Sequence, residues 1–151
     1  MKINPRSIRL FTLFKLPLVY LSGVRVVRIE ENSVEVRVRH RWINQNPFRS
    51  MFWAVQGMAA ELASGVLLMR KVNDHDMQIS MLLIETKASF SKKAKGKITF
   101  NCNEGESAHN LVEKAIVTKQ GQSQWFVCVG VDESGDEVSR FNFHWSVRCK
   151  A

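Results

Sequence analysis

The sequence contains none of the short motifs that mark the commonest hydrolase and nucleotide-binding classes. It has no GxSxG turn for a serine nucleophile, no GxxxxGK[ST] phosphate loop, no GxGxxG turn and no HExxH zinc motif. Each of these chemistries needs its residues at a fixed spacing. The sequence therefore gives no support for serine hydrolysis, nucleotide hydrolysis, dinucleotide binding or zinc proteolysis.

Cysteine is scarce and unclustered. Cys102, Cys128 and Cys149 lie in separate apolar segments, with no CxxC pair and no histidine at a zinc-ligand spacing. An odd, scattered set of thiols indicates reduced side chains in an intracellular protein. We therefore expect no metal, no redox cofactor and a cytoplasmic location.

The sequence also lacks a clear membrane-spanning run or signal peptide. Residues 1–20 are basic and apolar, but Lys15 and Pro17 interrupt the apolar run, and no small-x-small cleavage pattern follows it before the next strand. Asn4 and Pro5 instead predict the start of an N-terminal helical segment over residues 1–20. Its apolar face could pack across the domain, or its basic side chains could bring it to a membrane surface.

Positive charge is in excess, since 22 Lys and Arg residues against 14 Asp and Glu give a formal charge of +8. Such an excess attracts nucleic acid, an anionic membrane or a phosphorylated small molecule. The lysines within residues 92–97 fit a solvated strand edge better than a nucleic-acid site. Arg37 and Arg39 fit a solvated strand face better than a phosphate groove, and His75 between two aspartates fits a solvated loop better than a metal site. We expect no nucleic-acid partner.

The periodicity of the chain predicts one α+β domain over residues 1–151. Strand-like segments are predicted at 24–29, 34–40, 77–90, 97–102, 124–131 and 138–148, with a short helix or helical turn at 104–114. Four strands that follow a buried helix without long crossovers indicate an antiparallel sheet of about six strands that curls around that helix.

The central helix is predicted over residues 51–69 and is apolar on nearly every side, which is typical of a helix enclosed by other elements. One stripe of small side chains runs along it, with a carboxylate in its middle: Ser50, Ala54, Gly57, Glu61, Ser64 and Gly65. Glu61 would lose its water on such a stripe unless something partners it. It is either a functional carboxylate or a group that reaches solvent or a salt-bridge partner.

Several segments together resemble the DUF4442 group of the hotdog-fold thioesterase superfamily. They are Arg41-Trp42-Ile43-Asn44-Gln45-Asn46, Ser50-Met51-Phe52, the small-residue helix up to Leu68-Met69-Arg70, and Trp145-Ser146-Val147-Arg148. The resemblance follows order and spacing through nearly the whole chain. It implies a curved antiparallel sheet around the central helix, and a homodimer, in some cases a tetramer, with the site at the interface between two chains.

The resemblance also implies roles for particular residues. Glu61 matches the position of the family's helix carboxylate and would act as general base or nucleophile, while amides at the helix start would polarise a thioester carbonyl. The implied substrate-binding residues are Asn44, Asn46, Ser50, Met51, Phe52, Trp53 and Gly57. The expected function is hydrolysis of an acyl thioester of coenzyme A or acyl carrier protein.

Four positions depart from the family's usual residues. Arg49 replaces a loop glycine, Trp53 and Ala54 replace two glycines at the helix start, and Glu61 replaces an aspartate. Glycine allows close backbone approach, so the bulk of Trp53 would narrow the carbonyl site. These departures favour an alternative, a non-catalytic acyl-CoA or lipid-binding hotdog protein.

Overall fold

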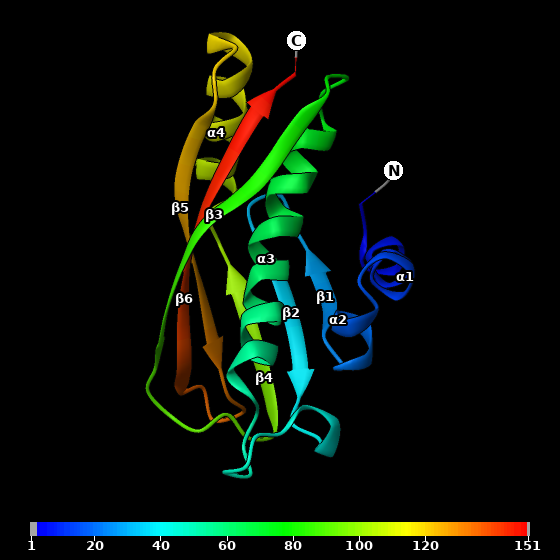
Figure 1. The fold of residues 1–151 in the computed structure, drawn as a ribbon, viewed down its shortest axis with the longest axis vertical. Helices are drawn as coiled ribbons and strands as arrows, with labels where there is room; N and C mark the ends of the chain where they lie inside the picture. Colours follow the sequence, from blue (N-terminus) through cyan, green and yellow to red (C-terminus); the bar gives the residue numbers. More distant parts are fainter. Residues whose placement is uncertain (1–2, 151) are drawn as a thin grey trace.

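The computed structural model describes residues 3–150 and contains four α-helices, one 3₁₀ turn and six strands within them (Figure 1). The helices are α1 (Pro5–Lys15), α2 (Pro17–Leu21), α3 (Trp53–Asn73) and α4 (Gly105–Thr118), and the 3₁₀ turn is η1 (Trp42–Asn44). The strands are β1 (Arg25–Ile29), β2 (Val34–Arg39), β3 (Ile79–Phe90), β4 (Lys97–Cys102), β5 (Gln122–Val131) and β6 (Glu137–Cys149).

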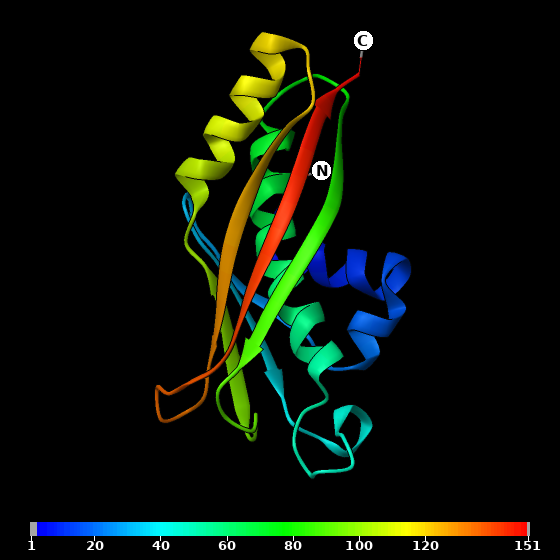
Figure 2. The ribbon, with the colours of Figure 1, turned by 60° about the vertical axis from the view of Figure 1, so that its left-hand side comes forward.

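The six strands form one antiparallel sheet in the order β1-β2-β4-β5-β6-β3. The sheet curves around α3, which lies along its concave side, while α4 lies beside the C-terminal half of α3 (Figures 1 and 2). This is the α+β architecture that the sequence predicts. β1 and β3 are the two edge strands, and each therefore has one row of backbone groups without a neighbouring strand.

Helix α3 forms the centre of the hydrophobic core. Ala59, Ala60, Leu67 and Leu68 are fully buried, and they meet the inward-facing side chains of the sheet. Alanine at the two contact positions allows the sheet to approach the helix closely, and burying each leucine stabilises the fold by about 1.5–3 kcal/mol.

The bounds of α3 differ from the predicted 51–69. Met51 and Phe52 precede the helix because their backbone N–H groups donate to Ala94 and Asn44 instead of entering a helical turn. At the other end the helix runs on to Asn73, since Lys71 is buried along its stem and its ammonium lies 2.8 Å from Glu31 in the β1–β2 turn.

The N-terminal helical segment is divided in two. α1 ends at Lys15, and Pro17 begins α2, a position that suits proline because the first N–H of a helix has no partner within it. α1 is anchored by Ile8 and Thr12, whereas α2 has no buried residue. The segment at 104–114 is also longer than predicted and forms the 14-residue helix α4.

Candidate functional site

The loop between β2 and α3 is held in place by Asn44. Its Oδ1 accepts from the backbone N–H of Arg41 at 2.8 Å, and its Nδ2 donates to the carbonyls of Ser22 at 3.0 Å and Arg39 at 2.9 Å. The side chain is 2% exposed. Because both its hydrogens are used inside the protein, Asn44 fixes the loop and does not line the cavity described below.

Asn46 organises the turn that leads into α3. Its Oδ1 accepts from the backbone N–H of Phe48 at 2.9 Å and of Ser50 at 3.2 Å, while its Nδ2 donates to Ser50 Oγ at 3.0 Å. Within this turn Arg49 has a φ of 58°, a left-handed conformation that glycine adopts at lower cost. The turn geometry explains why a glycine is suited to this position.

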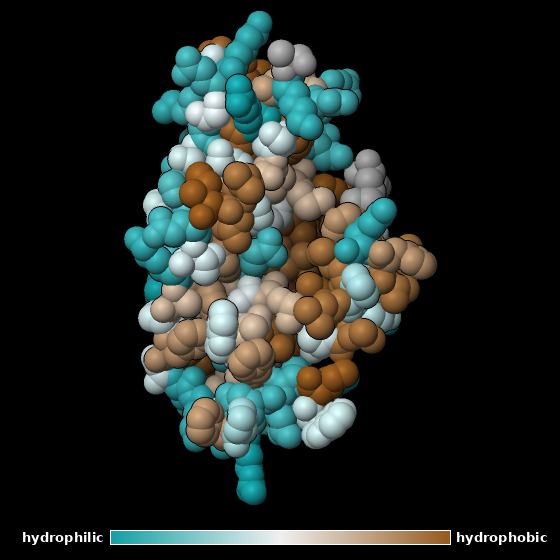
Figure 3. All heavy atoms as spheres, viewed as in Figure 1, coloured by the Kyte–Doolittle hydropathy of each residue, from teal (hydrophilic) through white to brown (hydrophobic). Residues whose placement is uncertain are grey.

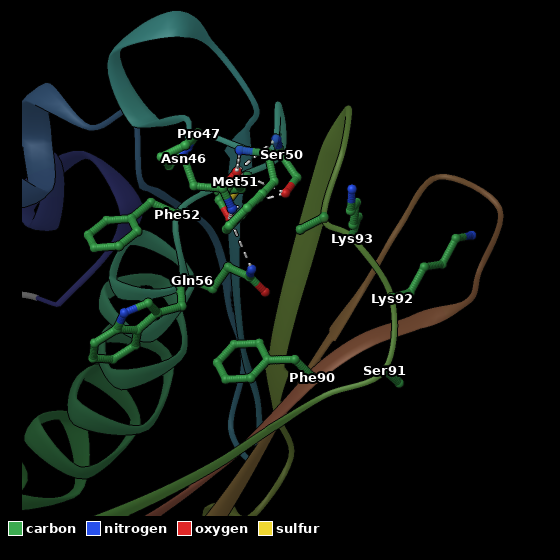
Figure 4. Close-up of a pocket in the computed structure, with 13 residues that line it drawn as sticks. Asn46, Pro47, Ser50, Met51, Phe52, Gln56, Phe90, Ser91, Lys92 and Lys93 are labelled. Atoms are coloured by element: carbon green, nitrogen blue, oxygen red, sulfur yellow. Dashed lines mark hydrogen bonds between the residues drawn. The ribbon is translucent and has the colours of Figure 1, made fainter.

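A cavity of about 500 Å³ opens at the start of α3 (Figure 4). Five of the residues expected in the site line it: Asn46, Ser50, Met51, Phe52 and Trp53. The opposite wall comes from the end of β3 and the loop after it, with Phe90, Ser91, Lys92 and Lys93. The cavity is mostly apolar with a few polar groups, which is the usual composition of a small-molecule site.

Gln56 also lines this cavity, and it was not among the residues expected from the sequence. The side chain is 4% exposed; its Nε2 donates to the carbonyl of Met51 at 3.4 Å, and its Oε1 has no hydrogen-bond partner within residues 3–150. A buried amide oxygen without a donor costs free energy unless a ligand or water supplies one. The signal in the sequence is that Gln56 is the one polar side chain between Trp53 and Ala60.

The first turn of α3 exposes free backbone donors. Phe52 precedes the helix and provides no side-chain cap, and the N–H groups of Trp53 and Ala54 have no acceptor in the described part of the chain. Free amides and the helix dipole make this end of α3 favourable for negative charge. The Trp53 ring, 56% exposed, packs edge-on against Phe52 at a centroid distance of 6.0 Å.

Glu61 is half-buried on α3, and within residues 3–150 no hydrogen bond or ion pair reaches its carboxylate. Burial raises the pKa of Glu61 above its ordinary value, because the charged form loses hydration without gaining a partner. A carboxylate with these properties is suited to accept a proton. Glu61 does not line the cavity, however, since it follows Trp53 by eight residues, about 12 Å along the helix axis.

The small-residue stripe does not lie on one kind of surface. A Cβ on Gly57 would lie 3.4 Å from the Phe141 ring, and one on Gly65 would lie 3.5 Å from the Trp145 ring. Ser64 is buried and accepts a hydrogen bond from Trp145 Nε1 at 2.9 Å. Gly57, Ser64 and Gly65 therefore face the sheet. Ala54, Gly57 and Glu61 keep partial exposure.

Residues 3–150 contain no metal-binding cluster and no membrane-spanning helix. No group of three or more His, Cys, Asp and Glu side chains is placed to hold a metal ion. No helix there is long and apolar enough to cross a membrane.

The comparison with protein families decides where the chain belongs. A family described as a domain of unknown function, DUF4442, matches residues 6–147. The chain belongs to the DUF4442 family. The match confirms the resemblance seen in the sequence.

Solved structures place this DUF4442 protein among hotdog folds. A Pseudomonas aeruginosa protein of unknown function, described as a probable thioesterase, has a TM-score of 0.83 and 22% identity over 99% of both chains. A thioesterase from Haemophilus influenzae has a TM-score of 0.71 and 11% identity over 99% of this chain and 93% of its own. At these identities the likeness establishes the hotdog fold. No curated protein matches the sequence of this DUF4442 chain.

Proposed function

We propose that this DUF4442 protein is a cytoplasmic thioesterase that hydrolyses acyl thioesters of coenzyme A or acyl carrier protein and acts as a homodimer. The observation that carries the proposal is on α3, where an unpartnered carboxylate with a raised pKa, Glu61, shares a helix with free amides at its start. Several structural neighbours are described as thioesterases, which supports this reaction class.

The reaction needs a base that activates water and hydrogen-bond donors that stabilise the oxyanion. Glu61 takes a proton from water, the resulting hydroxide attacks the thioester carbonyl, and the amides of Trp53 and Ala54 hold the oxyanion. Collapse of the intermediate breaks the carbon–sulfur bond, and the proton held by Glu61 passes to the leaving thiolate. Direct attack by Glu61 would instead displace the thiolate and form an anhydride, which water then hydrolyses.

The distance between Glu61 and the start of α3 supports a site that is shared between two chains. Glu61 lies about 12 Å along the helix from Trp53, whereas a general base and an oxyanion donor must each lie about 3 Å from the same reacting group. A second chain whose α3 runs antiparallel would bring its Glu61 beside the helix start of the first. Such a dimer has two equivalent sites at the interface.

The edge strand β3 supports this assembly. Its residues from Ile84 to Phe90 are all exposed, and its outer row of backbone groups has no neighbouring strand in the described chain. Leu82 and Ile84 add large exposed apolar side chains, 66% and 52% exposed. Long exposed edge strands are otherwise prone to uncontrolled association, so pairing with a second β3 suits this strand. Two such dimers could associate further into a tetramer.

The cavity at the helix start would hold the substrate next to the carbonyl. Asn46 and Ser50 shape its wall, and Gln56 Oε1 would accept a hydrogen bond from an N–H of the pantetheine arm. Lys92 is engaged by Asp132 at 2.6 Å and Asp136 at 2.7 Å, whereas Lys93 has no ion pair in the described chain. Lys93 is therefore the cation available to a phosphate or to an acidic carrier protein.

The test is a hydrolysis screen over short, long and aromatic acyl-CoAs that follows the absorbance of the thioester itself, because the partly exposed Cys149 would react with thiol dyes. The wild type should hydrolyse at least one of these substrates. Glu61→Gln should abolish turnover while retaining substrate binding. A hydrolytic rate that survives in Glu61→Gln would refute the assignment of the carboxylate.

A second candidate function is acyl-CoA or lipid binding without catalysis. The observation that favours it is the bulk of Trp53 at the point where a carbonyl would meet the amides, with no carboxylate among the cavity residues. A binding protein would retain acyl-CoA in equilibrium dialysis and show no turnover with any substrate. In that case Glu61→Gln would leave every measured property of the ligand complex unchanged.

A further inference from the structure

The N-terminal helices expose a concentrated apolar surface. Leu10, Phe14, Leu18 and Leu21 are 59%, 75%, 70% and 63% exposed, and Leu13 and Leu16 lie between them. Single exposed apolar side chains are common, but six within twelve residues form a patch that calls for a partner. Figure 3 shows this patch as brown side chains over α1 and α2, at the right of the view.

The patch is not a face left over from packing into this domain. α1 already meets the core through Ile8 and Thr12, on the side away from Leu10 and Phe14. α2 contributes no buried residue at all. The outward side chains therefore lie on a surface that the described chain does not cover.

The charged residues of α1, α2 and β1 are all positive. The first acidic residue of the sequence is Glu30, and the 29 residues before it include six cations: Lys2, Arg6, Arg9, Lys15, Arg25 and Arg28. Arg6, Arg9 and Lys15 are exposed on α1, and none of them has an ion pair within residues 3–150. α1, α2 and β1 therefore contain no acidic side chain that could neutralise these three cations.

A cleft of about 450 Å³ between α1 and β1 gathers three of these arginines. Arg6, Arg9 and Arg25 line it together with Pro5 and Val26. Arg25 is positioned by two hydrogen bonds from Nη1, to the carbonyls of Tyr20 at 2.8 Å and Val24 at 2.7 Å. The guanidinium also lies over the Tyr20 ring, 4.1 Å from its centroid, which holds it at the wall of the cleft. Guanidinium groups bind phosphates well.

The arginines also repel one another. The pKa of Arg25 lies below its ordinary value, chiefly because of burial, and the nearby charges of Arg9 and Arg41 lower it further. A bound anion would relieve this repulsion. A second copy of the chain in twofold contact here would bring the same cations against themselves, so self-association through this surface is unfavourable.

We propose that α1 and α2 form a peripheral membrane-binding surface, in which Phe14 and the exposed leucines enter the interface of an anionic bilayer while Arg6, Arg9 and Arg25 contact lipid phosphates. Apolar side chains at the headgroup boundary with cations around them are the combination that binds such interfaces. The surface does not depend on whether the protein hydrolyses thioesters. It would keep the protein beside lipids without any membrane-spanning helix.

The test is co-sedimentation of the full chain with vesicles of phosphatidylcholine alone and of phosphatidylcholine mixed with phosphatidylglycerol. Binding should be stronger to the mixed vesicles and should weaken as salt is added. Phe14→Glu and Leu18→Glu should each reduce the affinity at least about tenfold, and Arg6→Gln about fivefold. Each variant should keep the wild-type thermal unfolding curve, because these side chains are exposed.

Two matched controls come from α4, far from the patch. Val117 is 78% exposed, so Val117→Glu introduces the same charge at an equally exposed apolar site and should bind vesicles like the wild type. Lys114→Gln should likewise have little effect. The proposal is overturned if neither kind of vesicle sediments the protein. It is also overturned if Phe14→Glu lowers the molecular mass in light scattering while vesicle binding persists, since a second copy would then cover the patch.

Discussion

Trp145 on β6 donates its indole N–H to Ser64 Oγ on α3 across 2.9 Å, and both side chains are buried. The bond ties the central helix to the strand that lies next to the edge of the sheet. Gly65 lies against the same ring, since a Cβ there would be at ordinary contact distance from it, 3.5 Å. Ser64 and Gly65, at the C-terminal end of the small-residue stripe, therefore serve packing. The part of the stripe proposed to serve function lies closer to the start of α3.

We predict that Ser64→Ala destabilises the protein by about 1–3 kcal/mol, because the buried indole N–H loses its acceptor. The free energy of unfolding in urea measures the effect. Ser123→Ala, at an exposed serine of β5, is the control and should change stability little. Equal stability of the two variants would mean that the Trp145 bond contributes nothing net.

Glu61→Gln is predicted to stabilise the fold at neutral pH, by a few degrees in Tm. The carboxyl has an ordinary pKa near 4.5 when unfolded and a raised pKa when folded, so the folded chain holds its proton to higher pH. The free energy of unfolding therefore falls as the pH rises from the unfolded pKa of Glu61 to its folded pKa. Above the folded pKa this loss of stability is complete. Glutamine carries no charge and avoids that loss.

The stability difference between wild type and Glu61→Gln should be largest near about pH 8 and should shrink toward about pH 4. Thermal unfolding of both proteins across this range measures it. A difference that stays constant with pH would show that ionisation of Glu61 does not affect the fold. A difference of the opposite sign would mean that the carboxylate has a favourable partner.

Gln56→Leu is predicted to weaken substrate binding without harming the fold. Leucine removes the unpartnered Oε1, and the Met51 carbonyl still accepts from Asn46 Nδ2 at 3.3 Å, so the free energy of unfolding should stay within about 1 kcal/mol of the wild type or rise. Loss of one hydrogen bond to the ligand should raise KM about tenfold with kcat little changed. Gln124→Leu, at an exposed glutamine, should affect neither quantity.

Leu82→Arg and Ile84→Arg are predicted to convert the dimer to monomer, because each places a charge at an exposed apolar position of the edge strand β3. Light scattering after gel filtration should show the change in mass, and hydrolysis should fall with it. Val117→Arg, which adds the same charge on α4, should remain a dimer. A wild-type mass for both β3 variants would place the interface elsewhere.

Much of the fold could be predicted from the sequence because the local and tertiary signals agree. Alternating Val34, Val36 and Val38 are all buried, as a half-buried strand requires, and the apolar central helix is enclosed. The misplaced boundaries have tertiary causes. Met51 and Phe52 were expected inside the helix, but distant acceptors at Ala94 and Asn44 hold their amides. The sequence contains no local signal for such contacts.

The site could be predicted only in part. The loop and helix start were identified, and Asn46, Ser50, Met51, Phe52 and Trp53 do gather around one cavity. The far wall at Phe90–Lys93 could not be foreseen, because it depends on where the end of β3 and the loop after it lie relative to the start of α3. The sequence also could not separate Asn44, whose hydrogens the loop uses, from Asn46, since both are asparagines of one loop.

In the proposed dimer, one active site combines Glu61 from one chain with the amides at the start of α3 from another. The most direct test pairs two inactive variants, Glu61→Gln and Trp53→Pro, by co-expression. Trp53→Pro removes an amide N–H at the first helical position, which proline tolerates, and Phe52 already has the extended backbone that precedes proline.

Each variant alone should hydrolyse no thioester. Half of the randomly paired dimers are hybrids, and each hybrid has one intact site of two, so the mixture should recover about a quarter of the wild-type rate. Recovery of that size would establish a site shared between chains. A mixture that is dimeric but as inactive as its components would refute a shared site and would place the base and the amides in the same chain.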